Sequence, residues 1–317
     1  MKIILPGGSG QVGGLLARAF VAHGHDVVVL SRRPASAPWR VTAWDAKTLG
    51  PWAAELDGAD VVINLAGRSV NCRYNAANRR EIIESRVDST RVVGQAIGAA
   101  SRPPRVWLQA STATIYAHRY DAPNDEITGF IGRNDSQEPA SWRFSIEVAT
   151  AWERTANDAV TPGTRKVLLR SAMTMSPDRG GVFDALLGLV RRGLGGTSGD
   201  GRQFVSWVHE RDFIRAVYWL IDQHIEGPVN IASPNPIPNA SFMKSLRSAW
   251  GIRLGLPANR WMLEVGAFLM RTETELVLKS RRVVPTRLMQ SGFTFDLPDW
   301  PQAAADLCRR WRAQAQH

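Results

Sequence analysis

The sequence predicts an α/β protein with a doubly wound parallel sheet and a smaller, mostly helical C-terminal lobe. Through the first half of the chain, short β-rich runs alternate with longer amphipathic stretches, a pattern typical of parallel strands joined by helices. After residue 170 glycine and proline become frequent, and mostly helical patterns run to the end. We therefore expect a sheet domain over residues 1–170 and a second lobe over residues 171–317, some of whose segments return to the sheet.

Six strands and three helices are predicted in the first domain. The strands are short apolar runs, and the helices have apolar residues at three- and four-residue steps. A further strand, Val229–Ala232, is expected in the second lobe. The first six strands are Ile3–Pro6, Asp26–Leu30, Val41–Trp44, Val61–Leu65, Val106–Ala110 and Lys166–Arg170, and the helices are Gln11–His23, Ala76–Ala100 and Ser141–Asn157.

Composition excludes several classes of protein. Hydrophobic residues make up 44% and charged residues 21% of the chain, values ordinary for a globular protein. No apolar run reaches the roughly 18–20 residues that span a bilayer, and Met1 leads directly into an apolar strand without a secretory signal. The net charge is +10, but its arginines are scattered, so neither nucleic acid nor a membrane is expected as a partner. The expected location is cytoplasmic, and the basic surface would suit an anionic small molecule.

A glycine-rich turn follows the first strand directly and leads into a helix. Gly7 permits a tight turn, Gly10 allows close approach of a pyrophosphate, and Gly13 lets the helix pack against the strand. The helix N-terminus then offers free N–H groups to the phosphates. This arrangement predicts a Rossmann-type dinucleotide site, with the alternative of a merely tight turn. The residues expected to contact the cofactor here are Gly7, Ser9, Gly10, Gln11, Val12 and Gly13.

The end of the second predicted strand indicates which dinucleotide binds. An NAD site usually carries Asp or Glu here to hold the ribose 2′-hydroxyl, whereas this chain has Ser31, Arg32 and Arg33. Guanidinium groups bind a 2′-phosphate through charge-assisted hydrogen bonds. NADP(H) is therefore favoured over NAD(H), although two solvated loop arginines are the alternative.

Several motifs together resemble the extended short-chain dehydrogenases/reductases, which include NAD(P)-dependent epimerases and dehydratases. The later motifs resemble an atypical epimerase-like subfamily, found in bacteria and in animals, with its own C-terminal helical extension. The resemblance covers nearly the whole chain, and it implies cofactor contacts from Leu65, Ala66, Gly67, Arg86 and Ser111. The motifs are Gly7-x-x-Gly10-x-x-Gly13, Asn64–Gly67, Ser111–Tyr116, Glu84–Thr90, Gly199–Gln203, Trp207–Asp212 and Ser280–Pro285.

The resemblance also exposes a departure at the expected catalytic helix. Typical members carry Tyr-x-x-x-Lys there, in which the phenol is the general acid/base and the lysine lowers its pKa and holds the ribose. This chain has Phe144 and Val148 at those positions, and no Tyr-x-x-x-Lys occurs anywhere in it. Thr112 fills the place of the Ser or Thr that positions the substrate oxygen.

Other residues could still perform the chemistry. Tyr116, just after the fifth strand, is the first candidate acid, with a packing role as the alternative. Glu147 and Glu153 lie on the catalytic helix but are more often surface or ion-paired residues in such positions. Arg202 and Gln203, which follow a glycine-rich turn, could hold an anionic part of the substrate, or could belong to a solvated loop. The histidine spacing indicates no metal site.

Two functions follow from these residues. The first is an NADP(H)-dependent oxidoreductase or epimerase-like enzyme that acts on a hydroxyl- or carbonyl-bearing small molecule with non-standard proton-transfer residues. The second is a non-catalytic NADP(H)-binding sensor or regulatory protein, which the loss of the Tyr and Lys favours. Thr112, Tyr116 and the loop at Arg202 leave a cleft ready for a substrate, which favours the enzyme.

Overall fold

A seven-stranded parallel sheet organises the protein. The computed structural model describes residues 1–132, 139–258 and 278–314. The strand order is β10 (Gly227–Ile231), β6 (Arg165–Ser171), β5 (Val106–Thr112), β4 (Val61–Asn64), β1 (Lys2–Pro6), β2 (Asp26–Ser31) and β3 (Arg40–Ala43), and each neighbouring pair is parallel. The chain therefore builds the sheet outward in two directions from the β1–β4 junction, as in a doubly wound fold. The predicted fold class is confirmed.

The predicted elements of the first domain are present, with boundaries shifted by one or two residues. Val229–Ala232 also appears, as β10, and it extends the main sheet beside β6. The strands of the sheet are β1 (Lys2–Pro6), β2 (Asp26–Ser31), β3 (Arg40–Ala43), β4 (Val61–Asn64), β5 (Val106–Thr112), β6 (Arg165–Ser171) and β10 (Gly227–Ile231), and the first-domain helices are α1 (Gln11–Ala22), α2 (Ala76–Ala99) and α3 (Ala140–Asp158), with two short turns, η1 (Pro51–Leu56) and η2 (Ala113–Ile115).

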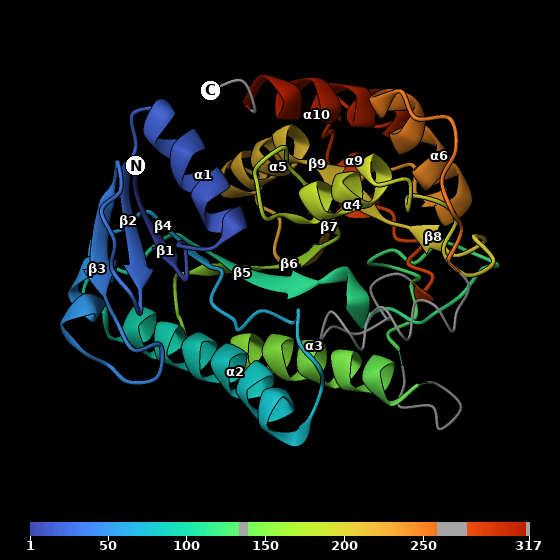
Figure 1. The fold of residues 1–317 in the computed structure, drawn as a ribbon. Helices are drawn as coiled ribbons and strands as arrows, with labels where there is room; N and C mark the ends of the chain where they lie inside the picture. The colour runs from blue at the N-terminus through green and yellow to red at the C-terminus, as the bar shows by residue number, and fades with distance from the viewer. Residues whose placement is uncertain (133–138, 259–277, 315–317) are drawn as a thin grey trace.

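Helices cover both faces of this sheet (Figure 1). On one face α1 and α5 (Glu210–Asp222) pack through residues such as Leu16, Phe20 and Phe213. On the other face α2 and α3 pack through residues such as Val93 and Ala156. Strands buried on both faces must be apolar at almost every position, which explains why the sequence shows continuous apolar runs instead of strict alternation.

The second lobe adds a separate core of helices above the C-terminal ends of the strands. There α10 (Trp300–Gln314) packs beside α6 (Asn239–Trp250) (Figure 1), and the ring of Trp300 stacks on Phe242 with centroids 4.0 Å apart. None of the helices in the described ranges is long and apolar enough to cross a membrane. The remaining elements are β7 (Met173–Met175), α4 (Val182–Arg191), β8 (Phe204–Val205), β9 (Trp207–His209), β11 (Ile237–Pro238), α6 (Asn239–Trp250), α9 (Thr286–Gln290) and α10 (Trp300–Gln314).

A buried ion pair joins α3 to the sheet. Arg170 on β6 donates from Nε and Nη2 to the two carboxylate oxygens of Glu153, at 2.8 and 2.7 Å. The hydroxyl of Ser111 on β5 donates to the same carboxylate at 2.6 Å. Arg170 Nη1 also donates to the hydroxyl of Tyr116 at 3.0 Å, and this hydroxyl donates to Asn230 Oδ1 on β10 at 2.9 Å. One network thus connects three strands and a helix.

Glu153→Gln is expected to lower the free energy of unfolding by about 3 kcal/mol, because it leaves the buried Arg170 guanidinium without a counter-charge. Urea denaturation of the purified variant measures this change. Glu147→Gln is the matched control, since Glu147 lies exposed on the same helix. Equal stability of the two variants would contradict a structural role for the ion pair.

Candidate cofactor and substrate site

The glycine-rich turn lies at the β1–β4 junction, where the strand order reverses. Gly7 has a φ of +73°, and a Cβ on it would lie 2.5 Å from the Ala66 Cα. A Cβ on Gly13 would lie 2.4 Å from the Gly8 backbone, so α1 can approach the turn only because residue 13 is glycine. Gly10 is the N-cap residue of α1 and has no side chain that could accept a hydrogen bond from the first N–H groups of the helix. These N–H groups are therefore available to a ligand. These features fit a pyrophosphate-binding turn.

The residues after β2 lie beside this turn. The hydroxyl of Ser31 is 3.4 Å from the hydroxyl of Ser9, and it accepts the Arg33 N–H at 3.2 Å. Arg32 and Arg33 are exposed, and no described carboxylate forms an ion pair with either. Two guanidinium groups are thus available where the sequence predicted a 2′-phosphate.

The segment after β4 forms the next wall of the site. Leu65 donates its N–H to the Pro6 carbonyl at 2.9 Å, and Ala66 donates to the side-chain oxygen of Asn64 at 3.1 Å. Asn64 is itself buried and donates to Gln109 at 3.0 Å. These hydrogen bonds hold Ala66 next to Gly7, and the chain then continues toward α2.

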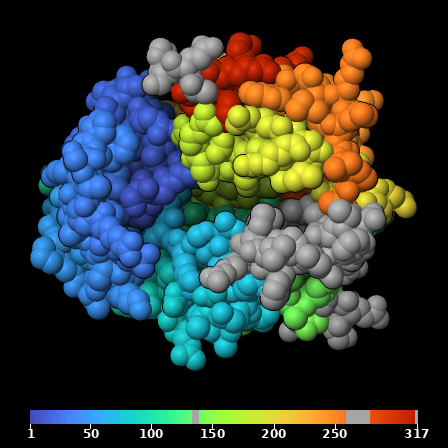
Figure 2. All heavy atoms as spheres, viewed as in Figure 1, coloured from blue at the N-terminus to red at the C-terminus, as the bar shows by residue number. Residues whose placement is uncertain are grey.

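The second lobe contacts the same turn. A Cβ on Gly181, the residue that caps α4, would lie 1.9 Å from the side-chain nitrogen of Gln11. Figure 2 shows the blue N-terminal segment and the yellow-green segment around α4 meeting on one face of the molecule, above the cyan segment that leads into α2. Val12, the next residue of the helix, packs against the hydrophobic core. The candidate dinucleotide path is therefore bounded by both lobes.

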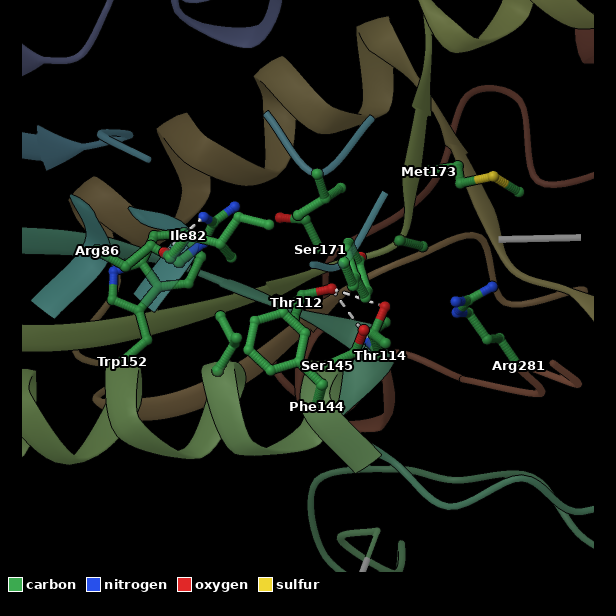
Figure 3. A pocket seen from close by; sticks show the side chains of 15 residues that line it. Ile82, Arg86, Thr112, Thr114, Phe144, Ser145, Trp152, Ser171, Met173 and Arg281 are labelled. Atoms are coloured by element: carbon green, nitrogen blue, oxygen red, sulfur yellow. Dashed lines mark hydrogen bonds between the residues drawn. The ribbon is translucent and has the colours of Figure 1, made fainter. Parts of the chain in front are cut away.

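A cavity of about 200 Å³ lies at the C-terminal ends of β5 and β6, between α2 and α3. Ligands of doubly wound sheets bind at this end of the strands. In Figure 3, Arg86 and Arg281 lie toward opposite ends of the cavity, with Thr112 and Phe144 between them. The described residues that line it are Val70, Tyr74, Ile82, Arg86, Thr112, Ala113, Thr114, Phe144, Ser145, Val148, Trp152, Ser171, Ala172, Met173 and Arg281.

The cavity brings together Thr112 and the two positions that lack Tyr and Lys. Phe144 and Val148 form an apolar wall from α3. Opposite them the hydroxyl of Thr112 donates to the Thr114 hydroxyl at 3.0 Å and accepts the Thr114 N–H at 3.1 Å. Two further hydroxyl side chains, Ser145 and Ser171, line the same space. The sequence analysis missed these residues, because neither belongs to a recognised motif.

Arg86 extends from α2 into the cavity, and hydrogen bonds to two backbone carbonyls hold its side chain in place. Its Nη1 donates to the carbonyls of Arg68 and Ile82, both at 3.0 Å. The guanidinium lies 4.9 Å from the centroid of the Trp152 ring, and a Cβ on Gly67 would be only 3.1 Å from its Cζ. Burial lowers the pKa of Arg86 to about 10, and an electrostatic interaction with Tyr74 opposes this effect. No described carboxylate pairs with Arg86.

Tyr74 is the one tyrosine among the described residues that line the cavity. It lies in the segment before α2, and its ring meets Phe144 edge-on with centroids 5.0 Å apart. A phenol therefore stands next to the position from which the usual catalytic tyrosine is missing. The sequence analysis did not single out Tyr74, because in the sequence this residue lies far from both the fifth strand and the expected catalytic helix.

Two predicted residues face away from the cavity. Tyr116 is 2% exposed, and its hydroxyl bonds to Arg170 and Asn230. Burial raises the pKa of Tyr116, so its phenol holds its proton more tightly than a solvated one. Ser111 donates to Glu153. Neither residue belongs to the lining, so the catalytic role of Tyr116 and the cofactor contact of Ser111 stay predictions that these contacts do not favour.

The predicted substrate loop also lies outside the cavity lining. Arg202 is exposed, with its guanidinium 6.0 Å from the centroid of the Tyr120 ring. Gln203 is buried and donates to the Ser198 carbonyl at 2.9 Å. Their substrate-binding role stays a prediction. Within the described ranges, no cluster of three His, Cys, Asp or Glu side chains could hold a metal ion.

Sequence comparison relates this chain to epimerase-family proteins along nearly its whole length. The epimerase family protein SDR39U1 of Bos taurus is 30% identical over 97% of this chain and 99% of the relative. The human protein of the same name is 29% identical over 97% of this chain and 99% of its own. Residues 259–307 match a second family model, a domain of unknown function (DUF1731).

Solved structures share the fold. The human SDR39U1 protein, crystallised with NADPH, superposes with a TM-score of 0.85 at 27% identity, covering 98% of this chain and 99% of the other. A nucleoside-diphosphate sugar epimerase from Corynebacterium glutamicum gives a TM-score of 0.75 at 28% identity, covering all of this chain and 60% of that one. Residues 3–232 match the model of the NAD dependent epimerase/dehydratase family, and the chain belongs to that family.

Proposed function

We propose that this protein is an NADP(H)-dependent oxidoreductase or epimerase-like enzyme acting on a hydroxyl- or carbonyl-bearing small molecule. The observation that carries the proposal is the cavity, which opens at the C-terminal ends of β5 and β6 and is lined by Thr112 and Tyr74. The turn at Gly7, expected to bind the cofactor, lies at the β1–β4 junction of the same sheet. The crystallisation of a relative with NADPH supports the choice of cofactor.

The residues that would hold the cofactor fit its chemistry. The α1 N-terminus and the glycines of the turn would receive the pyrophosphate, and Arg32 and Arg33 would receive the 2′-phosphate. When bound, NADPH supplies a hydride to a carbonyl carbon, and NADP⁺ accepts one from an alcohol. The protein must then position the substrate oxygen and move one proton.

Thr112 and Tyr74 are the residues we propose for these tasks. The Thr112 hydroxyl is oriented by both the N–H and the hydroxyl of Thr114, which leaves one lone pair to accept a hydrogen bond from a substrate hydroxyl. Tyr74 contributes a phenol to the cavity wall beside Phe144. In reduction the phenol donates its proton to the carbonyl oxygen, and in oxidation the phenolate takes the proton of the alcohol.

A second candidate is a non-catalytic NADP(H)-binding protein in which cofactor occupancy sets the shape of a surface. The apolar wall of Phe144 and Val148 favours it, because these side chains cannot transfer protons. The contact between Gly181 and Gln11 would carry occupancy of the turn to the second lobe.

Gly13→Ala is expected to weaken NADPH binding at least tenfold, about 1.4 kcal/mol, because its Cβ would collide with the backbone at Gly8. Gly14→Ala is the matched control, since its Cβ would meet only the end of the Arg18 side chain, at 3.6 Å. Isothermal titration of each folded variant with NADPH makes the measurement. Identical affinities in the two variants would argue against the turn as the pyrophosphate site.

NADPH is expected to bind at least tenfold, about 1.4 kcal/mol, more tightly than NADH, and Arg32→Ala should erase the difference. The physical reason is the loss of a charge-assisted hydrogen bond to the 2′-phosphate. Arg154→Ala, which removes an exposed arginine from α3, should leave the preference intact. Equal binding of both cofactors to the unaltered protein would defeat the assignment.

Turnover is tested by following NADPH absorbance against a panel of carbonyl compounds. Tyr74→Phe is expected to lower kcat about a hundredfold, the usual effect of losing a general acid, and Thr112→Ala should lower it as well. Tyr116→Phe gives the comparison: a loss confined to that variant would assign the proton to Tyr116 instead. No turnover despite tight NADPH binding would support the non-catalytic candidate.

A further inference from the structure

The charge inside the cavity has one sign among the described residues. Arg86 and Arg281 line it, and none of the described lining residues is Asp or Glu. Glu153, on the neighbouring helix α3, is turned toward the sheet by Arg170 and Ser111 and gives the cavity no negative charge. A carboxylate that entered would therefore be attracted by Arg86 and would meet no negative charge among the described lining residues.

The guanidinium of Arg86 is fixed in place with one edge unused. Nη1 is occupied by the carbonyls of Arg68 and Ile82, whereas Nε and Nη2 form no hydrogen bond with a described residue. These two nitrogens form the side-on fork that matches the two oxygens of a carboxylate. The ring on which the guanidinium lies is also fixed, because Trp152 donates from its indole nitrogen to Thr90 at 3.0 Å.

The apolar part of the lining favours a particular chemistry for the rest of the ligand, beyond its carboxylate. Phe144 and Val148 replace a phenol and an ammonium, and Val70, Ile82 and Met173 add further apolar surface. A sugar hydroxyl that faced these apolar walls, away from the hydroxyl side chains of Thr112, Ser145 and Ser171, would have no partner, which costs about 1–3 kcal/mol for each buried group. An apolar chain or ring would gain from the same contacts.

We propose that the cavity binds a small organic acid with an apolar body, and that Arg86 receives its carboxylate through Nε and Nη2. The inference rests on the proposed function, because it names the substrate class of the same cavity. Arg86 would then contact the substrate, because the turn at Gly7 and the arginines after β2 would already bind the phosphates of the cofactor.

The test uses the full chain saturated with NADPH, titrated calorimetrically with 4-methyl-2-oxopentanoate, with phenylpyruvate and with the amide of each. Each acid is expected to bind at least tenfold more tightly than its amide. Arg86→Met, which keeps an apolar side chain over Trp152, should lower the affinity for the acids at least tenfold and remove the preference. Arg80→Met, which changes an exposed arginine on the same helix, should leave both unchanged.

Arg86→Lys covers the case in which the methionine variant does not fold. It retains the charge but not the fork, so it should bind the acids more weakly than the unaltered protein and still more tightly than the amides. Inorganic phosphate and UDP-glucose serve as the other ligand classes. Binding of either more tightly than the acids would overturn the proposal.

Three further results would also overturn it. The first is equal affinity for acid and amide, or no binding of either acid below about 1 mM, a binding free energy of about −4 kcal/mol. The second is unchanged acid binding in Arg86→Met. The third is an Arg86→Met protein that no longer binds NADPH but still binds the acids. This result would assign Arg86 to the cofactor. Failure to bind NADPH at all would instead contradict the proposed function, so the two failures are distinguishable.

Discussion

The contact of the backbone at Gly7 with the backbone at Ala66 is the constraint on which the site depends. Parallel strands β1 and β4 lie side by side, yet their following segments leave toward opposite faces of the sheet, α1 on one and α2 on the other. Residue 7 lies so close to Ala66 that a Cβ there would overlap it. The crevice between the diverging segments is what a dinucleotide requires, and it exists only if this contact is made without side chains.

The chemistry of the cavity follows from which helix supplies the polar groups. The catalytic pair of typical relatives lies on one helix, a turn apart, whereas here α3 presents an apolar wall. The guanidinium of Arg86 comes instead from α2, and the phenol of Tyr74 comes from the segment before this helix. With the polar groups on the opposite side of the cavity, α3 presents an apolar surface, and this is the reason that we propose a different ligand and a different proton path.

The buried network around Glu153 explains why the polar residues near the end of β5 divide into two groups. Successive strand residues point to opposite faces, so Thr112 faces the cavity while Ser111 faces the carboxylate. The hydroxyl of Tyr116 belongs to the same network, because it accepts a hydrogen bond from Arg170 and donates one to Asn230. Residues that adjoin in sequence therefore have different surroundings, Thr112 the cavity and Ser111 the buried ion pair.

Local sequence was sufficient to predict the fold and the close backbone contacts of the glycine-rich turn. The strands and helices have periods visible in the chain, and the spacing of Gly7, Gly10 and Gly13 encodes close approaches that occur within one strand–turn–helix unit. The cavity could not be predicted from local sequence, because Tyr74, Arg86 and Thr112 come from segments that are separate in the chain and come together only in the folded protein. Proximity to the fifth strand suggested Tyr116, but the direction of its side chain was decided by Arg170 and Asn230, which are distant in sequence. Close backbone approaches such as those at Gly7 and Gly13 can be recognised from the spacing of glycines in the chain, whereas the set of side chains that line the cavity depends on packing between segments that are distant in sequence.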